Sequence, residues 1–162
     1  MVPKQNLTPQ QALQKAKHYC AYQERSHYEV KEKLYSFGLY RTDVEQLLSQ
    51  LIEEDYLNEA RYAEHFAGGR FRMKQWGRVK IEYELKQKKV SSYNIKNALK
   101  SIDNEDYEQI LLKLASTKWN ALQGEQVYSR LSKTTAYLMQ KGYEQALISK
   151  TLALLKNEVK TS

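Results

Sequence analysis

The sequence predicts an all-α protein made of tandem three-helix repeats that form an elongated, curved array. Three observations predict this class. Gly (6) and Pro (2) are too scarce among 162 residues to supply the regularly spaced turns of a β-sandwich or barrel. Apolar residues recur at helical spacing between residues typical of helix ends. One apolar pattern also occurs three times along the chain, which is the sequence signature of a repeat architecture.

Helix-end residues mark the elements in order. Thr8-Pro9-Gln10-Gln11 combines an N-cap, a proline at the first helical position and a capping-box glutamine. Ser26-His27-Tyr28-Glu29 and Thr42-Asp43-Val44-Glu45 predict two further helix starts, and Gly38 and Gly142 stand where left-handed C-caps are needed. We therefore expect long helices over about 9–24, 58–76 and 104–122, each followed by two helices joined by a tight turn. The first helix of the middle pair is expected over 78–89.

The threefold pattern is anchored on Leu34, Leu85 and Leu138. Apolar residues follow each anchor at the same offsets of five, ten and fourteen positions. They are Leu39, Val90 and Tyr143, then Val44, Ile95 and Ile148, then Leu48, Leu99 and Leu152. The pattern predicts repeats at 9–57, 58–103 and 104–156, with flexible ends at 1–8 and 157–162. A compact chain of this length would have a radius of gyration of about 15 Å, and we expect this one to exceed it.

Composition restricts the class of function. The formal charge of +7 and the pI near 9.3 favour an acidic partner, with nucleic acid first. Charge is segregated: residues 41–64 hold 2 basic and 7 acidic side chains, whereas residues 70–89 hold 8 basic and 2 acidic. The single cysteine, Cys20, excludes an internal disulfide and a cysteine-based zinc site. With no catalytic motif, signal-peptide pattern or membrane-length apolar stretch, we expect a cytoplasmic, monomeric non-enzyme without cofactor, metal or membrane contact.

The middle repeat holds the candidate binding residues. Basic side chains beside an aromatic ring can contact phosphates while a base stacks on the ring. The candidates for DNA or filament binding are Arg61, His65, Arg72, Lys74, Trp76, Arg78, Lys80, Lys88 and Lys89. A structural interpretation stays open, in which Arg61 pairs with an acid, Trp76 is core, and Arg78, Glu82 and Lys86 form a helical charge ladder. Arg70 is expected to be structural, and Lys118, Arg130, Lys133, Lys141 and Lys150 to be solvated.

Four segments, together covering roughly 10–155, resemble the RecX family of bacterial regulators of the recombinase RecA. They are Arg25-Ser26 with Glu29, Lys33 and Leu34; the run 56–63 (YLNEARYA); Gly77 with Lys80, Ile81, Glu84 and Leu85; and the run 138–143 (LMQKGY). Two departures are Glu59, where Asp is commoner, and Lys89, where the family usually ends the helix with Gly. The resemblance implies tandem three-helix repeats that lie in the groove of the RecA–DNA filament and inhibit recombinase activity in recombination, DNA repair and the SOS response. It also implies binding to single- and double-stranded DNA.

Two other classes of function stay open. A helix-turn-helix-like DNA-binding protein could act without a recombinase, and Asn94, Lys96, Asn97 and Lys100 are its plausible base-reading set. An all-helical scaffold with incidental positive charge is the third class. Because phosphate neutralisation releases counterions, the salt dependence of DNA affinity separates such a scaffold from a DNA-binding protein.

Overall fold

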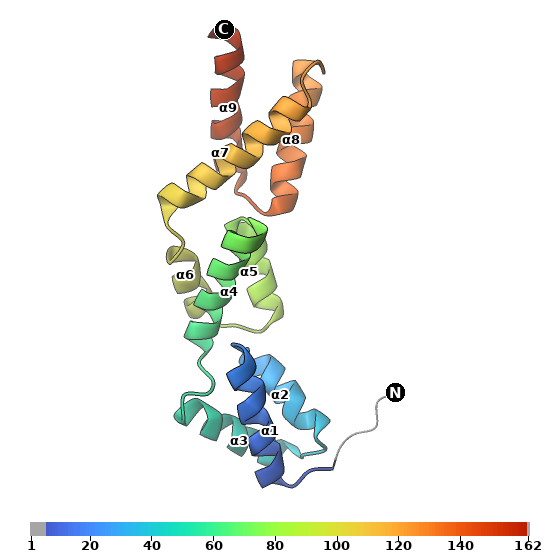
Figure 1. The fold of residues 1–162 in the computed structure, drawn as a ribbon, viewed down its shortest axis with the longest axis vertical. Coiled ribbons are helices and arrows are strands. Elements are labelled where there is room, and N and C mark those ends of the chain that lie inside the picture. The colour runs from blue at the N-terminus through green and yellow to red at the C-terminus, as the bar shows by residue number, and fades with distance from the viewer. Residues whose placement is uncertain (1–5, 162) are drawn as a thin grey trace. The chain divides into compact units, whose positions relative to one another are not determined.

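The computed structural model describes residues 6–161, with side chains through residue 158, and over this range the chain forms nine α-helices and no strand (Figure 1). The all-α class is confirmed. None of the described helices is both long and apolar enough to cross a bilayer. The helices are α1 (Pro9–Tyr22), α2 (His27–Ser36), α3 (Arg41–Glu53), α4 (Glu59–Lys74), α5 (Arg78–Gln87), α6 (Ser92–Lys100), α7 (Asn104–Ala121), α8 (Val127–Lys141) and α9 (Gln145–Thr161).

The helices belong to two compact units. The first contains the chain up to Phe66 together with Leu85–Ala98, and the second contains Ala67–Glu84 together with the chain from Leu99 onward. Helices α1, α2 and α3 pack on one another in the first unit, and α7, α8 and α9 do so in the second. Helices α4, α5 and α6 are each divided between the two units.

The two expected flexible ends lie partly outside the described residues, which omit 1–5 and 162. Within the N-terminal stretch, the Leu7 N–H donates to the Phe37 carbonyl at 3.0 Å, and the Thr8 hydroxyl caps α1. At the other end α9 continues to Thr161. The described parts of both stretches therefore take part in the regular structure.

Two of the three predicted helix starts are confirmed. Thr8 and Gln11 form the complete capping box of α1, and the Ser26 hydroxyl accepts from the Glu29 N–H at 3.0 Å. The start predicted at Thr42 is wrong, because α3 begins at Arg41 with extended Tyr40 at its N-cap. A Thr-x-x-Glu pattern also fits the first turn of a helix, and here an exposed Arg41–Glu45 ion pair at 2.9 Å spans that turn.

The threefold apolar pattern corresponds to buried positions. The anchors Leu34, Leu85 and Leu138 are fully buried, and the residues five and ten positions later are buried as well. Four positions after each anchor the backbone is left-handed, with φ of 85° at Gly38, 61° at Lys89 and 97° at Gly142. The same turn thus follows each anchor. It reverses the chain so that the apolar residues of the next helix join the core.

Replacing Lys89 with glycine is expected to stabilise the protein. The left-handed conformation costs a residue with a Cβ about 1–2 kcal/mol, and glycine avoids this cost. Part of the gain is lost, because glycine also raises the conformational entropy of the unfolded chain. The net gain in the free energy of unfolding should be about 0.5–1 kcal/mol, measured by urea denaturation. Lys96→Gly, inside α6, is the control and should lose about 1 kcal/mol. A loss at position 89 would show that the Lys89 side chain stabilises the turn.

In the first unit a polar contact joins α2 to α4 and α6. The His27 Nδ1 lies 3.5 Å from the Glu59 carboxylate, which also accepts from the Ser91 N–H at 2.7 Å and from the Asn94 amide at 3.0 Å. The His27 Nε2 is buried without a hydrogen-bond partner among the described residues. Burial lowers the pKa of His27, and the neighbouring Glu59 offsets this only in part. Burial raises the pKa of Glu59, but its hydrogen bonds outweigh that effect and hold the pKa below its usual value.

Acid is therefore expected to weaken this contact. A histidine whose folded pKa lies below 6.5 favours the unfolded chain once the pH falls through 6.5, and a carboxyl group with a depressed pKa has the same effect as the pH falls through 4.5. The free energy of unfolding should thus decrease from pH 7.5 to pH 5, as measured by urea titration. His27→Gln should flatten this decrease, whereas His65→Gln, at an exposed position, should not. If the free energy of unfolding depended on pH equally in His27→Gln and in the unsubstituted protein, His27 would not be the source of the acid sensitivity.

The corresponding contact in the second unit is made by backbone. The Gly77 N–H donates to the Lys141 carbonyl at 2.8 Å, and the Val79 N–H donates to the Gly142 carbonyl at 2.9 Å. The first turn of α5 thereby satisfies its N–H groups with carbonyls from the end of α8, so that opposite ends of two helix dipoles meet. A Cβ on Gly77 would lie 2.6 Å from the Tyr143 nitrogen, and one on Gly142 would lie 2.7 Å from the Lys80 nitrogen. Glycine is required at both positions.

Side chains surround this backbone contact. The Phe71, Tyr107 and Tyr143 rings pack in sequence, with centroids 5.7 Å and 5.1 Å apart. The Tyr107 hydroxyl accepts from the Arg78 N–H at 2.9 Å and donates to Glu144. Burial, followed by the bond to Glu144, raises the pKa of Tyr107, so the hydroxyl keeps its proton. The apolar packing and the satisfied polar groups together hold α5 against α7 and α8.

Candidate functional site

The nine candidate residues are divided between the two units. The first unit contains Arg61, His65, Lys88 and Lys89, and the second contains Arg72, Lys74, Trp76, Arg78 and Lys80. Each group is therefore considered separately. Within each unit, a basic side chain that already has a carboxylate partner is less available to bind an anion than one without such a partner.

Three of the candidate cations have a carboxylate partner: Arg61, Lys88 and Arg78. The Arg61 guanidinium contacts Glu24 at 2.7 Å and Asp55 at 3.1 Å, as the structural interpretation of this residue predicted. Lys88 lies 3.6 Å from Glu29.

Arg78 is similarly engaged. Its guanidinium stacks 3.8 Å from the Tyr107 ring centre, lies 3.4 Å from Glu144, and donates to the Asn104 side chain at 2.6 Å. These partners lie on α7 and at the start of α9, whereas the predicted charge ladder joined Arg78 to Glu82 along α5. The fold brings a carboxylate from 66 positions away instead.

The second unit also contains a basic cluster around an aromatic ring, which we call the Trp76 cluster (Arg70, Lys74, Trp76 and Lys80). The Lys80 ammonium lies 4.5 Å from the Trp76 ring centre, the Lys74 ammonium 5.5 Å and the Arg70 guanidinium 5.6 Å. Trp76 is half-buried, and among the described residues no carboxylate lies within 4.0 Å of Lys74 or Lys80. Lys74 and Lys80 thus place two cations without acidic partners, among the described residues, beside a half-buried ring.

The other candidates lie exposed on single elements. Arg72 extends from the last turn of α4 beside the Trp76 cluster in sequence, Lys89 occupies the left-handed turn after α5, and His65 lies on the exposed face of α4. The alternative base-reading set is less available, because the Asn94 amide is bonded to Glu59. Lys96, Asn97 and Lys100 are exposed on α6.

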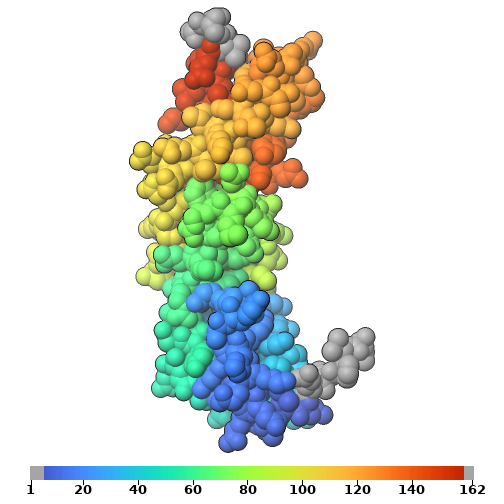
Figure 2. Space-filling model, viewed as in Figure 1, coloured from blue at the N-terminus to red at the C-terminus, as the bar shows by residue number. Residues whose placement is uncertain are grey.

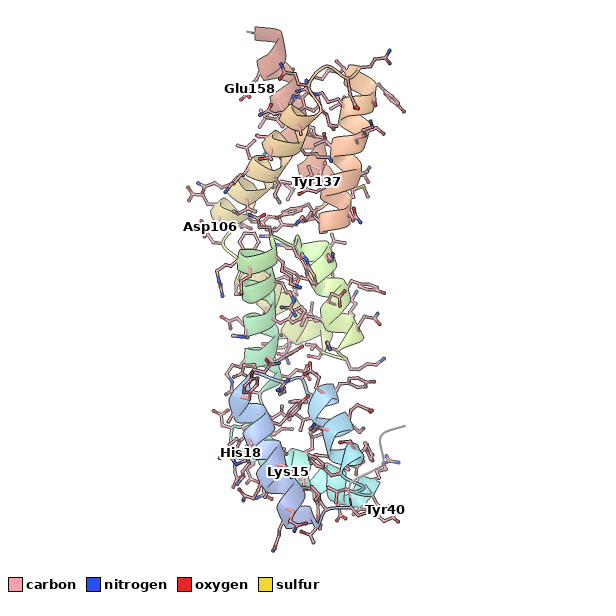
Figure 3. The ribbon with its side chains drawn as sticks, turned by 45° about the vertical axis from the view of Figure 1, so that its right-hand side comes forward. Lys15, His18, Tyr40, Asp106, Tyr137 and Glu158 are labelled. Atoms are coloured by element: carbon pink, nitrogen blue, oxygen red, sulfur yellow. The ribbon has the colours of Figure 1, made fainter. Side chains whose placement is uncertain are left out.

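Sequence reasoning missed a second basic site, a hollow of about 420 Å³ formed by α1, α2 and the link between them. We call it the α1–α2 hollow. Lys15 and His18 on α1, which Figure 3 labels, contribute to its lining, and α1 is at the surface in the view of Figure 2. Its lining, none of it acidic, consists of Lys15, His18, Tyr19, Tyr22, Arg25, Lys33 and Phe37.

The charges of residues 15–33, taken along the sequence, do not indicate the hollow. Residues 15–33 hold three acids, but Glu24 pairs with Arg61, and Glu29 bonds to the Tyr62 hydroxyl and Lys88. Two of the acids thus neutralise other parts of the first unit. The signal that could have revealed the hollow is helical spacing, since residues 15, 18, 19 and 22 follow the i, i+3, i+4, i+7 pattern of one helix face.

Arg130 corrects another expectation. We expected a solvated side chain, but Arg130 is buried, with its guanidinium carbon 3.9 Å from the centre of the Trp119 ring and its Nε donating to the Trp119 carbonyl at 2.8 Å. The residue therefore caps the end of α7. Cys20 is also buried, which raises the pKa of its thiol to about 11. The thiol stays protonated near neutral pH, and a protonated thiol is a poor nucleophile.

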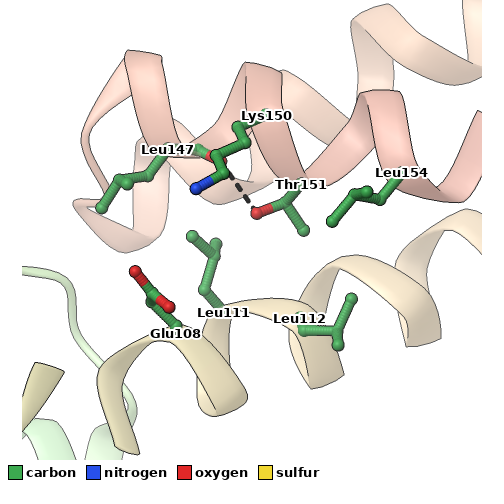
Figure 4. Close-up of a pocket in the computed structure, with 7 residues that line it drawn as sticks. All are labelled: Glu108, Leu111, Leu112, Leu147, Lys150, Thr151 and Leu154. Atoms are coloured by element: carbon green, nitrogen blue, oxygen red, sulfur yellow. Dashed lines mark hydrogen bonds between the residues drawn. The ribbon is translucent and has the colours of Figure 1, made fainter. Parts of the chain in front are cut away.

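A smaller groove of about 150 Å³ lies between α7 and α9 (Figure 4). Leucines from both helices line it, with Glu108 and Lys150 also contributing. The Thr151 hydroxyl donates to the Leu147 carbonyl of its own helix, so its proton is directed to the backbone. This groove is mainly apolar and does not resemble the two basic sites.

Comparison with known proteins relates these features to one family. Residues 58–99 match the family model "RecX, second three-helix domain", and residues 105–152 match "RecX, third three-helix domain". The crystal structure of RecX from Lactobacillus salivarius has the same fold, with a TM-score of 0.85 at 22% identity over 91% of this chain and 96% of the other. The predicted tandem three-helix repeats are confirmed by these matches.

Relatives named "Regulatory protein RecX" also match this chain in sequence. One from Prosthecochloris aestuarii is 30% identical over 141 residues, which is 87% of this chain and 91% of the relative. Another, from Clostridium perfringens strain 13, is 33% identical over 118 residues, 72% of this chain and 55% of the relative. The chain thus spans about half the length of the Clostridium relative and nearly all of the Prosthecochloris relative. The sequence resemblance, the two family models and these relatives establish that the chain belongs to the RecX family.

Proposed function

We propose that this chain is a non-enzymatic regulator that binds the RecA–DNA filament and inhibits recombinase activity. The family resemblance implies this partner, and the relatives' name, regulatory protein, supports a regulatory role. The structural observation that carries the proposal is the Trp76 cluster, where Lys74 and Lys80 flank a partly exposed ring without acidic partners among the described residues. Such a surface suits a phosphate backbone with accessible bases.

Binding rather than chemistry is the mechanism we propose. Lys74 and Lys80 of the Trp76 cluster would contact phosphates, and the ring would contact sugar or base. Contacts of this kind are electrostatic and independent of sequence, so their strength should decrease steeply with salt. An inhibitor that works in this way acts by occupying the filament and needs no nucleophile, metal or cofactor.

The test is the DNA-stimulated ATP hydrolysis of RecA on single-stranded DNA. With the chain in stoichiometric excess over RecA, hydrolysis should decrease well below the rate of the filament alone. Serum albumin at the same concentration is the protein control. Unchanged hydrolysis under these conditions would reject the proposal.

A further inference from the structure

We propose that the α1–α2 hollow binds one nucleotide unit of single-stranded DNA, with its phosphate held by Arg25, Lys15 and Lys33 and its base stacked on Tyr22. This inference rests on the DNA-binding part of the proposed function. It assigns that role to a site outside residues 58–99 and 105–152, where the family models match. The site is complete within the first unit.

Arg25 is pre-organised for an anion. Its Nε donates to the Tyr19 carbonyl at the end of α1 at 3.0 Å, and its guanidinium carbon lies 3.7 Å from the centre of the Tyr19 ring. These two contacts fix the plane of the guanidinium. Among the described residues its terminal nitrogens make no hydrogen bond, so they remain available to a phosphate oxygen pair. A fixed, planar fork loses little entropy when it binds phosphate in this way.

Two lysines add positive charge to the lining of the same hollow. The Lys33 ammonium lies 5.3 Å from the Tyr19 ring centre and 5.8 Å from that of Phe37, and the Lys15 ammonium lies 6.0 Å from Phe37. Three permanent cations therefore converge on a hollow whose lining contains no carboxylate. Without a bound anion these like charges repel one another, and an anion of two or more oxygens relieves that repulsion.

The aromatic lining points to a nucleotide instead of a simple anion. Tyr22 lines the hollow and is 84% exposed, so one ring face is open beside the cations. The Arg25 guanidinium carbon lies 6.0 Å from the Tyr22 ring centre, roughly the separation between a phosphate and its own base. Bases in a duplex are already stacked on each other, so an exposed ring of this kind favours a single strand.

The experiment measures binding by fluorescence anisotropy with the full chain and two labelled 12-mers, oligothymidine and an abasic deoxyribose-phosphate strand of equal charge. Tyr22→Leu should weaken oligothymidine binding about tenfold, because stacking is lost, and change the abasic strand less than twofold. Lys15→Gln with Lys33→Gln should weaken both strands about fivefold at 0.1 M salt and lower the salt slope by up to about 0.7, since the hollow holds a single phosphate of the strand.

Matched controls lie away from the hollow. Tyr128→Leu removes a tyrosine that is also 84% exposed, and Lys31→Gln with Lys113→Gln removes two charges from exposed positions. Both controls should bind within twofold of the unsubstituted protein. Thermal melting followed by circular dichroism verifies folding of every variant, and all substituted side chains are exposed.

Each result decides the assignment. If the unsubstituted chain binds oligothymidine and the hollow variants match the controls, the hollow is not the site and the proposed function stands. If Tyr22→Leu weakens the abasic strand equally, base stacking is wrong. If polyglutamate of equal length displaces oligothymidine as well as unlabelled oligothymidine does, the hollow takes acidic protein segments instead. If no oligonucleotide binds, this inference fails together with DNA binding by the free chain, and the ATP hydrolysis assay alone decides the filament proposal.

Discussion

Gly142→Ala is expected to destabilise the second unit by about 3 kcal/mol, the largest effect of any single substitution considered. The residue has φ of 97°, where an alanine pays about 1–2 kcal/mol. Its new Cβ would also lie 2.7 Å from the Lys80 nitrogen and closer still to the Lys80 Cβ, and such overpacking costs about 1–3 kcal/mol. For a protein of 162 residues this corresponds to a decrease in Tm of about 10 °C, measured by calorimetry.

Gly77→Ala should behave similarly for a different reason. Its φ is not in the left-handed region, but a Cβ there would collide with the Gly142 carbonyl that accepts the Val79 N–H. The control is Gly69→Ala, because Gly69 lies within α4 and a Cβ added there would meet no neighbouring atom within 4 Å. This substitution should raise the free energy of unfolding by about 0.5–1 kcal/mol. If the substitutions at 77 and 142 were as mild as that at 69, the backbone contact between α5 and α8 would not be a main source of stability.

The second large effect is expected on binding. Arg72→Glu combined with Lys80→Glu should weaken affinity for duplex DNA and for the RecA–DNA filament 100-fold or more at 0.1 M salt, with helicity unchanged. In the proposed binding mode, the double substitution would remove two phosphate contacts and add two repulsive charges. The salt slope on duplex DNA should decrease by about 1.8, since each contact contributes about 0.9.

The same charge reversal on α6 separates the two DNA-binding hypotheses. Lys96→Glu with Lys100→Glu changes the charge equally at exposed positions. If the chain reads bases in the manner of a helix-turn-helix protein, the α6 variant should show the larger loss, together with a strong preference for one sequence over random duplex. We expect the larger loss in the Arg72 and Lys80 variant. Unchanged binding in that variant would remove the Trp76 cluster from the interface.

The fold was largely predictable because its signals are local. The capping box at Thr8 and the glycine turn at Gly142 depend on a few neighbouring residues, and the apolar spacing from Leu34 describes one helix face at a time. The turn at Lys89 was harder, since a lysine adopts the conformation that glycine has at 38 and 142. There the buried residues on either side impose a backbone that the local sequence disfavours.

The site was less predictable because pairing depends on residues distant in sequence. Nothing near Arg61 indicates Glu24, and nothing near Arg78 indicates Glu144, yet these carboxylates decide which cations are already neutralised. The α1–α2 hollow was missed for the same reason, since the acids that mask its charge along the sequence are directed elsewhere in the fold. A sum of charges over a segment does not show in which direction each side chain points. A helical wheel shows this direction only relative to the helix axis.

The most direct test of the account is a pull-down of this chain with RecA in the presence and absence of single-stranded DNA. Tagged chain is immobilised, and RecA retention is compared with no DNA, with DNA and a nucleotide that maintains the filament, and with DNA alone as the bridging control. We predict strong retention only with the assembled filament, and its loss in the Arg72→Glu and Lys80→Glu variant. RecA retention that is absent under all conditions, or identical with and without DNA, would contradict the account.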